Sequence, residues 1–196
     1  MRIDLDVIEG WIAPNSRVLD LGCGDGTLLD NLRRNKSVSA LGIEIDAANF
    51  NLCLERGLNV IEQNLDDGLA NFADGAFDVV VMTQAIQAMK RPDHILEEML
   101  RVGRQGIVAF PNFGHWSCRF YLGTLGRMPV SRNLPLSWYE TPNIHFCTIR
   151  DFEALCHERN ITILNREVTG ATGKLETLAR AWPNLFASTA IYHLSR

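Results

Sequence analysis

Short apolar runs rich in valine and isoleucine alternate with helical patterns through the first 110 residues, and this alternation constrains the fold most strongly. Strands that alternate with helices predict a parallel sheet built from strand-helix-strand units. Such strands are buried on both faces and are continuously hydrophobic, as in the run Val-Val-Val-Met at residues 79–82. The expected strands of this part of the chain are residues 17–20, 38–44, 59–62, 77–82 and 106–110.

The last third of the chain adds two β-rich segments, residues 161–168 and 188–194, with an expected helix over residues 175–182 between them. The sequence therefore predicts an α/β fold, a doubly wound and mostly parallel sheet of about seven strands whose last pair includes an antiparallel strand. The chain has 196 residues, of which 46% are hydrophobic, and this is the usual size of one compact domain. We expect a single domain over residues 1–196.

A long insertion follows the fifth strand, at about residues 111–147. Connections within a domain are typically a few residues long, and longer loops are usually functional or disordered. Disordered segments are poor in aromatic residues, whereas this insertion is rich in them. Two interpretations stay open: a lid whose aromatic side chains turn inward, and a protein interface, where Trp, Tyr and Arg are enriched. The aromatic residues of the insertion are Phe113, Trp116, Phe120, Tyr121, Trp138, Tyr139 and Phe146.

Composition and charge disfavour several classes of protein. A net charge of −4 gives no indication of the positively charged surface by which proteins bind nucleic acid. No run of about 18 apolar residues is present to span a membrane, and the first residues lack the basic head and apolar core of a signal peptide. The five cysteines are odd in number and scattered, which favours the reducing cytoplasm over a disulfide framework. The histidines and cysteines form no recognisable metal-binding pattern.

A glycine-rich turn follows the first strand, in the run Val-Leu-Asp-Leu-Gly-Cys-Gly-Asp-Gly at residues 18–26. Ligands of doubly wound sheets bind at the carboxyl ends of the strands, and glycines allow the backbone to approach them closely. Gly22, Gly24 and Gly26 are therefore expected to line a nucleoside site. The dinucleotide fingerprint requires a glycine where this chain has Thr27, which argues against a nicotinamide oxidoreductase.

Two acids end the first two strands, Asp20 and Glu44, and a parallel sheet places them side by side. Glu44 is positioned to accept hydrogen bonds from the vicinal hydroxyls of a ribose, and Asp20 to reach a cationic amino group directly or through water. The alternative interpretation is that Glu44 and Asp46 only cap the helix that follows.

This pattern resembles the class I S-adenosylmethionine-dependent methyltransferases, in which a strand ending in an acid precedes Gly-x-Gly-x-Gly. The resemblance implies a Rossmann-like fold and S-adenosylmethionine, or S-adenosylhomocysteine, as the ligand. In that superfamily an acid after the third strand holds the adenine amino group; Asp66 is the match, with Leu65 and Asp67 as alternatives. The predicted cofactor-binding residues are Asp20, Gly22, Cys23, Gly24, Gly26, Glu44, Ile45, Leu65, Asp66, Thr83 and Gln84.

Further runs resemble the methionine biosynthesis protein MetW family: Thr-Gln-Ala-Ile-Gln at residues 83–87, Phe-Pro-Asn-Phe-Gly-His-Trp at 110–116, Gly-Arg-Met-Pro-Val at 126–130, and the segment 137–148. The resemblance implies a role in methionine biosynthesis, with homoserine O-acyltransferase as the partner of an accessory or regulatory subunit. The alternative is an active methyltransferase on an unidentified acceptor. Because methyl transfer needs mainly alignment of the reactants, the sequence leaves open whether the chain is an enzyme.

Catalytic candidates come from the insertion, which starts at the carboxyl edge of the sheet. His115 and His145 are candidates for a general base, and Tyr139 for a group that orients an acceptor. The alternative is that a histidine among aromatic residues is a hydrogen-bonded structural group.

Overall fold

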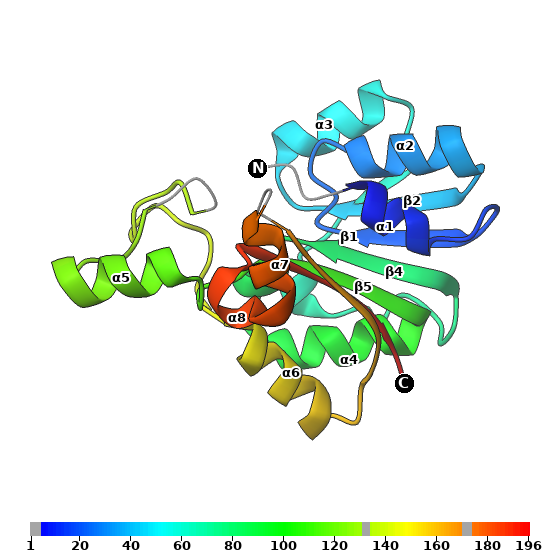
Figure 1. The fold of residues 1–196 in the computed structure, drawn as a ribbon. Helices are drawn as coiled ribbons and strands as arrows, with labels where there is room; N and C mark the ends of the chain where they lie inside the picture. The colour runs from blue at the N-terminus through cyan, green and yellow to red at the C-terminus, as the bar shows by residue number, and fades with distance from the viewer. Residues whose placement is uncertain (1–4, 131–133, 170–173) are drawn as a thin grey trace.

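A computed structural model describes residues 5–130, 134–169 and 174–196. It contains a seven-stranded sheet in the order β3-β2-β1-β4-β5-β7-β6, drawn with its flanking helices in Figure 1. The doubly wound α/β fold predicted from the sequence is confirmed. The strands are β1 (Arg17–Leu21), β2 (Ser39–Glu44), β3 (Val60–Glu62), β4 (Phe77–Thr83), β5 (Gly103–Pro111), β6 (Thr162–Thr169) and β7 (Thr189–Ser195).

The first five strands run parallel, and β7 pairs antiparallel with both β5 and β6. In the register of the sheet, Asp20 of β1 lies opposite Gly42 of β2 and Val81 of β4. All carboxyl ends of the parallel strands therefore meet at one edge. The glycine turn, Glu44 and the end of β4 all lie at this edge.

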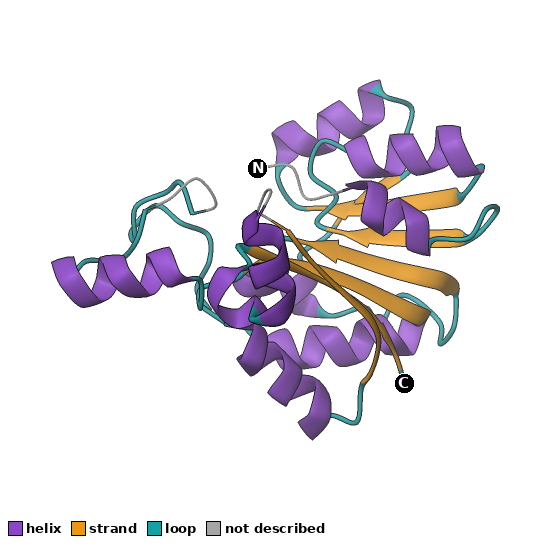
Figure 2. Ribbon diagram, viewed as in Figure 1, coloured by secondary structure: helices purple, strands orange, loops and turns teal. Residues whose placement is uncertain are grey.

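Helices cover both faces of the sheet (Figure 2). Val79 and Val81 of β4 pack into a cluster with residues of α1 and α2, whereas Val80 and Met82 pack into a cluster with residues of α4 and α6. Because side chains alternate along a strand, one apolar strand serves both faces. The helices are α1 (Leu5–Trp11), α2 (Thr27–Lys36), α3 (Ala47–Glu55), α4 (Pro92–Val102), α5 (Trp116–Leu125), α6 (Ile149–Glu158), α7 (Lys174–Ala181) and α8 (Pro183–Phe186), with short 3₁₀ turns η1 (Leu65–Asp67) and η2 (Ile86–Ala88).

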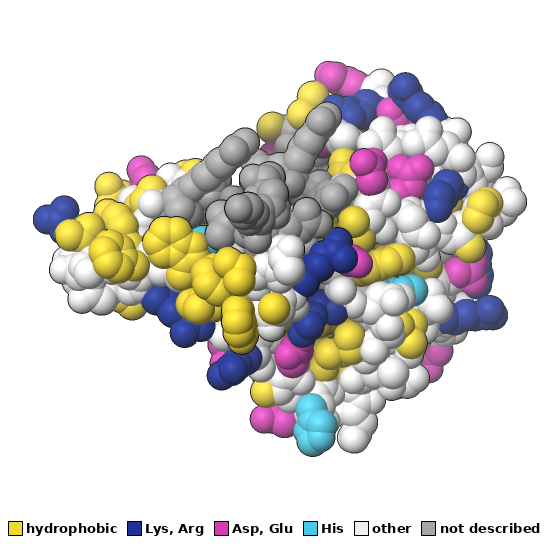
Figure 3. Space-filling model, in the orientation of Figure 1, with side chains coloured by type: hydrophobic (Ala, Val, Ile, Leu, Met, Phe, Trp, Pro, Cys, Tyr) yellow, Lys and Arg dark blue, Asp and Glu magenta, His cyan; other side chains and the backbone are white. Residues whose placement is uncertain are grey.

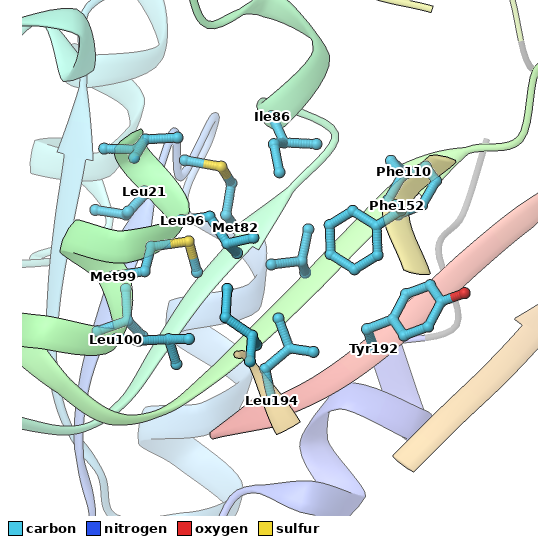
Figure 4. Close-up of a cluster of buried hydrophobic side chains, with 14 of the residues drawn as sticks. Leu21, Met82, Ile86, Leu96, Met99, Leu100, Phe110, Phe152, Tyr192 and Leu194 are labelled. Atoms are coloured by element: carbon cyan, nitrogen blue, oxygen red, sulfur yellow. The ribbon is translucent and has the colours of Figure 1, made fainter. Parts of the chain in front are cut away.

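The larger core joins the second half of the chain to the parallel strands (Figure 4). Phe110 of β5, Phe152 of α6 and Tyr192 of β7 pack together, with ring centroids 4.7–6.0 Å apart. The Tyr192 hydroxyl donates to Glu153 Oε1 at 2.9 Å, so its polar end has a partner. This packing fixes the end of β5, where the long insertion begins.

The insertion contains a helix that the sequence pattern does not reveal. The 10-residue helix α5 has one buried side chain, Cys118, and therefore lacks the periodic apolar face by which helices are recognised. Regular structure resumes after the insertion, where Thr148 caps α6 and forms a capping box with Asp151. In the described part of the chain, none of the helices is long and apolar enough to cross a membrane.

Candidate functional site

The glycine turn leaves β1 and enters α2 with three residues in the left-handed region, Gly22 at φ 74°, Gly24 at φ 55° and Gly26 at φ 75°. The Gly22 N–H donates to Ile43 O at 2.9 Å, which ties the turn to β2. A Cβ atom on Gly26 would lie 2.4 Å from Leu58 Cδ1, whereas a Cβ atom on Gly24 would meet nothing within 4 Å. Gly26 is therefore required for packing, and Gly24 faces open space at the edge of the sheet.

Glu44 closes this edge on the side of β2. Its Oε2 accepts a hydrogen bond from Gly24 N–H at 2.7 Å, and its Oε1 accepts from Ile45 N–H at 2.8 Å and Asp46 N–H at 2.9 Å. Asp46 has a separate role, because its carboxylate accepts from Asn49 N–H at 2.9 Å and caps α3. The capping role considered for both acids thus belongs to Asp46, while Glu44 joins the turn to β2.

Asp20 lies beneath the turn and is 1% exposed. Its Oδ1 is a buried acceptor without a hydrogen-bond partner among the described residues. Burial and, to a smaller extent, the nearby Glu44 charge raise the pKa of Asp20 to about 7. A buried polar atom normally has a partner, so Asp20 Oδ1 is an acceptor to which a ligand could donate.

Cys23 and Ile45 have opposite surroundings. Cys23 is buried with Cys53, and their sulfur atoms lie 3.8 Å apart. Burial raises the pKa of the Cys23 thiol. Ile45 is 60% exposed immediately beside Glu44. The side chain of Ile45 therefore offers an apolar surface at the edge, whereas Cys23 borders it only through its backbone.

Asp66 belongs to η1 and is engaged with a neighbouring segment. Its Oδ1 accepts from Lys90 N–H at 2.9 Å, and its Oδ2 lies 3.9 Å from Lys90 Nζ. Leu65 is buried, and Asp67 is exposed. Of Leu65, Asp66 and Asp67, Asp66 is the one that links η1 to the segment preceding α4. The adenine-binding role of this residue stays a prediction.

The end of β4 brings Thr83 and Gln84 to the same edge. Gln84 has φ 60°, an uncommon value for a residue other than glycine, and its N–H donates to Ala109 O of β5 at 2.7 Å. Strain of this kind is often found at binding sites. The position of Gln84 agrees with the predicted site, and its contact with a ligand stays a prediction.

Gln87 is a residue that the sequence analysis did not select. Its side chain is 3% exposed, and its Nε2 donates to Pro111 O at 3.2 Å and to Cys147 Sγ at 3.3 Å. Its main-chain oxygen accepts from Ile144 N–H at 2.9 Å and His145 N–H at 3.0 Å. Gln87 therefore fastens the two ends of the insertion to η2, beside Gln84.

The catalytic candidates have different surroundings. His115 caps α5: its Nδ1 accepts from Ser117 N–H at 3.3 Å and lies 2.7 Å from Ser117 Oγ. Burial lowers the pKa of His115. His145 Nε2 lies 3.4 Å from Lys90 O, and exposed Tyr139 packs edge-on against Trp138. His145 thus contacts the segment that contains Lys90, whereas His115 has a structural role as the cap of α5.

Comparison with known proteins identifies the family. Residues 2–194 match the family model described as methionine biosynthesis protein MetW. The chain belongs to the MetW family.

A MetW-family relative supports the same assignment. The bifunctional methionine biosynthesis protein MetXA/MetW of Rhodopirellula baltica is 34% identical over 206 residues, which cover 100% of this chain and 33% of the relative. The chain therefore spans about a third of that protein. The family model and this relative are both described as methionine biosynthesis proteins, and they agree on the family.

Solved structures confirm the class I methyltransferase fold. A S-adenosylmethionine-dependent methyltransferase from Archaeoglobus fulgidus superposes with a TM-score of 0.71 at 13% identity, covering 98% of this chain and 95% of that one. The [4+2]-cyclase SpnF superposes with a TM-score of 0.69 at 16% identity, covering 98% and 80%. These similarities show the fold; the second indicates that the fold alone does not determine the chemistry.

Proposed function

We propose that this MetW-family chain binds S-adenosylmethionine at the edge formed by Asp20, Gly24 and Glu44, and acts as an accessory or regulatory subunit of a homoserine O-acyltransferase in the cytoplasm. The observation that carries the ligand half of the proposal is the unpartnered oxygen of Asp20, buried beside the glycine turn. Burying a carboxylate is costly unless it is paired. The cationic amino group of the methionine moiety would supply that pair.

The neighbouring groups fit the rest of the nucleoside. A carboxylate can accept about four hydrogen bonds. The Glu44 carboxylate accepts three from backbone amides, so it can accept one more from a ribose hydroxyl. Exposed Ile45 offers an apolar surface for a flat base, and the open space at Gly24 permits close approach of the ligand to the backbone. When bound, S-adenosylmethionine would supply an activated methyl group or serve as a signal of methionine supply.

The partner half of the proposal rests on the Rhodopirellula relative, whose name joins MetXA to MetW in one protein. Joining two modules in one chain makes their encounter intramolecular and raises their effective concentration. We infer that the present chain associates with a homoserine O-acyltransferase.

Methyl transfer to an unidentified acceptor is the second candidate, favoured by the shared fold with solved methyltransferases. Alignment of the acceptor with the sulfonium methyl group would contribute most of the rate. The two candidates differ in whether S-adenosylmethionine is consumed.

One assay separates them. Homoserine O-acyltransferase is measured alone and with an equimolar amount of this chain, with and without S-adenosylmethionine, while formation of S-adenosylhomocysteine is followed. A changed acylation rate without S-adenosylhomocysteine supports the accessory role. Formation of S-adenosylhomocysteine supports methyl transfer. An unchanged rate and no association of the two proteins would reject the partner.

The ligand site is tested separately by calorimetric titration. Glu44→Ala should weaken S-adenosylmethionine binding at least tenfold, because it removes the ribose acceptor and releases the Gly24 N–H. Glu55→Ala, at the exposed end of α3, is the matched control and should bind like the wild type. Equal affinities for both variants would remove Glu44 from the site.

A further inference from the structure

Helix α5 and the segment after it form an arm, defined as residues 113–147, whose described parts are 113–130 and 134–147. Figure 1 shows α5 standing away from the sheet and from the helices that cover it. Large apolar side chains on the arm face solvent: Phe120 is 65% exposed, Leu125 60% and Trp138 72%. Figure 3 shows hydrophobic side chains gathered over this part of the molecule. Such patches mark interaction sites.

The arm also carries a hollow that could receive a side chain from outside. A hollow open to solvent is lined by Phe113, Met128, Leu136, Trp138 and Phe146, among others. Phe113 and Phe146, which come from opposite ends of the arm, pack with ring centroids 4.5 Å apart and form one wall. Interfaces are dominated by aromatic or aliphatic side chains that fill such spaces. The hollow is therefore suited to an apolar anchor.

Charge distinguishes the possible occupants. The described arm carries two cations, Arg119 and Arg127, and one acid, Glu140. Both arginines are exposed; Arg119 donates to Gly114 O at 2.6 Å, whereas Arg127 forms no ion pair with the part of the chain that the structure describes. Two copies meeting arm to arm would bring together two surfaces that each carry two cations and one acid among their described residues. A different protein with carboxylates at the rim complements Arg127 better.

We propose that the arm is the docking surface for the acyltransferase, which inserts an apolar side chain into the hollow and places a carboxylate opposite Arg127. This inference rests on the proposed function, because it names the surface through which that partner is met. The exposed face of α5 widens the contact, and the insertion thus serves as an interface rather than a lid.

A pair of double variants tests the surface. Phe120→Ser with Leu125→Ser removes two exposed apolar side chains from α5; Leu52→Ser with Leu54→Ser removes two exposed leucines from α3 and is the matched control. Affinity for purified acyltransferase is measured by calorimetry. The α5 variant should bind at least about tenfold more weakly than the wild type, and the α3 variant should bind like it. Arg127→Glu should also weaken binding, with a smaller dependence on salt.

The outcomes separate this inference from the proposed function. If the wild-type chain does not bind the acyltransferase, the proposed partner is wrong, and the proposal that the arm binds it is wrong as well. If the wild type binds and the α5 variant binds equally well, the arm is not the interface and the partner stands. If sedimentation shows that the chain alone forms dimers and that only the α5 variant abolishes them, a second copy occupies the arm. Thermal shifts with S-adenosylmethionine, equal in all variants, would show that the site beside β1 is intact.

Discussion

Asp20 places a second carboxyl group beside Glu44 at a buried edge, and this makes folding depend on pH. Its pKa is raised from 3.8 to about 7, first by burial and then by the Glu44 charge. Between these values the folded chain keeps a proton that the unfolded chain releases, so stability falls as pH rises through this range. Asp20→Asn cannot ionise, so its melting temperature relative to the wild type should rise as pH increases from about 4 to about 8, with the smallest difference at the acid end. Parallel melting profiles for the two proteins would contradict this.

Asp20 should also give ligand binding a pH dependence. A cationic amino group beside Asp20 favours the ionised carboxylate, so affinity for S-adenosylhomocysteine should rise from about pH 5.5 to 7.5 with release of a proton. Calorimetry in buffers of different ionisation enthalpy measures that proton. Asp20→Asn should bind more weakly with a flat profile. A flat profile in the wild type would place the amino group elsewhere.

In the glycine turn, Gly26 is needed for packing, whereas Gly24 is expected to be needed for ligand approach. Gly24, Gly26 and Gly75 all have positive φ, but only at Gly26 would a Cβ atom collide with Leu58 and Cys53. Alanine costs about 1–2 kcal/mol in this conformation, and overpacking at Gly26 adds about 1–3 kcal/mol. Thermal denaturation should therefore show the largest loss for Gly26→Ala, with Gly75→Ala, in a remote loop, as the control.

Gly24→Ala should lose about as much stability as Gly75→Ala but should bind S-adenosylmethionine at least tenfold more weakly, because its new methyl group would enter the open space above the turn. Calorimetric titration of the three alanine variants gives the comparison. Unchanged affinity of Gly24→Ala would mean that the ligand does not approach this backbone.

The elements differ in how far the sequence could predict them. Buried parallel strands are continuous apolar runs, and the expected strands match those observed, although β5 begins at Gly103, three residues before the predicted residue 106. Asp20 and Glu44 could be placed together because strand ends share one edge. Helix α5 could not be predicted, because a helix exposed on most sides has no apolar period. Gln87 was missed because its burial depends on Pro111 and Cys147, distant in sequence.

At the scale of the whole molecule, Gln87 connects the ligand edge to the arm. It follows the strained Gln84 by three residues, and its main-chain oxygen holds Ile144 and His145 at the end of the arm. A ligand that changes the backbone at Gln84 would therefore act on the segment that positions the docking surface. Such coupling requires the ligand to favour one arrangement of the arm over another.

Linkage makes this coupling measurable from both directions. If S-adenosylmethionine changes the affinity for the acyltransferase by some factor, typically about 5–150-fold, the acyltransferase must change the affinity for S-adenosylmethionine by the same factor. Two calorimetric titrations, one with each component held in excess, should give equal factors. Gln87→Ala should bring both factors toward one while each component still binds alone, because the arm loses the side-chain bonds to Pro111 and Cys147. Unchanged factors in Gln87→Ala would mean that the side-chain bonds of Gln87 do not carry the coupling. Factors of one in the wild type, with an altered acylation rate, would mean that the ligand acts on the acyltransferase's turnover, since reciprocity holds for binding and not for kcat.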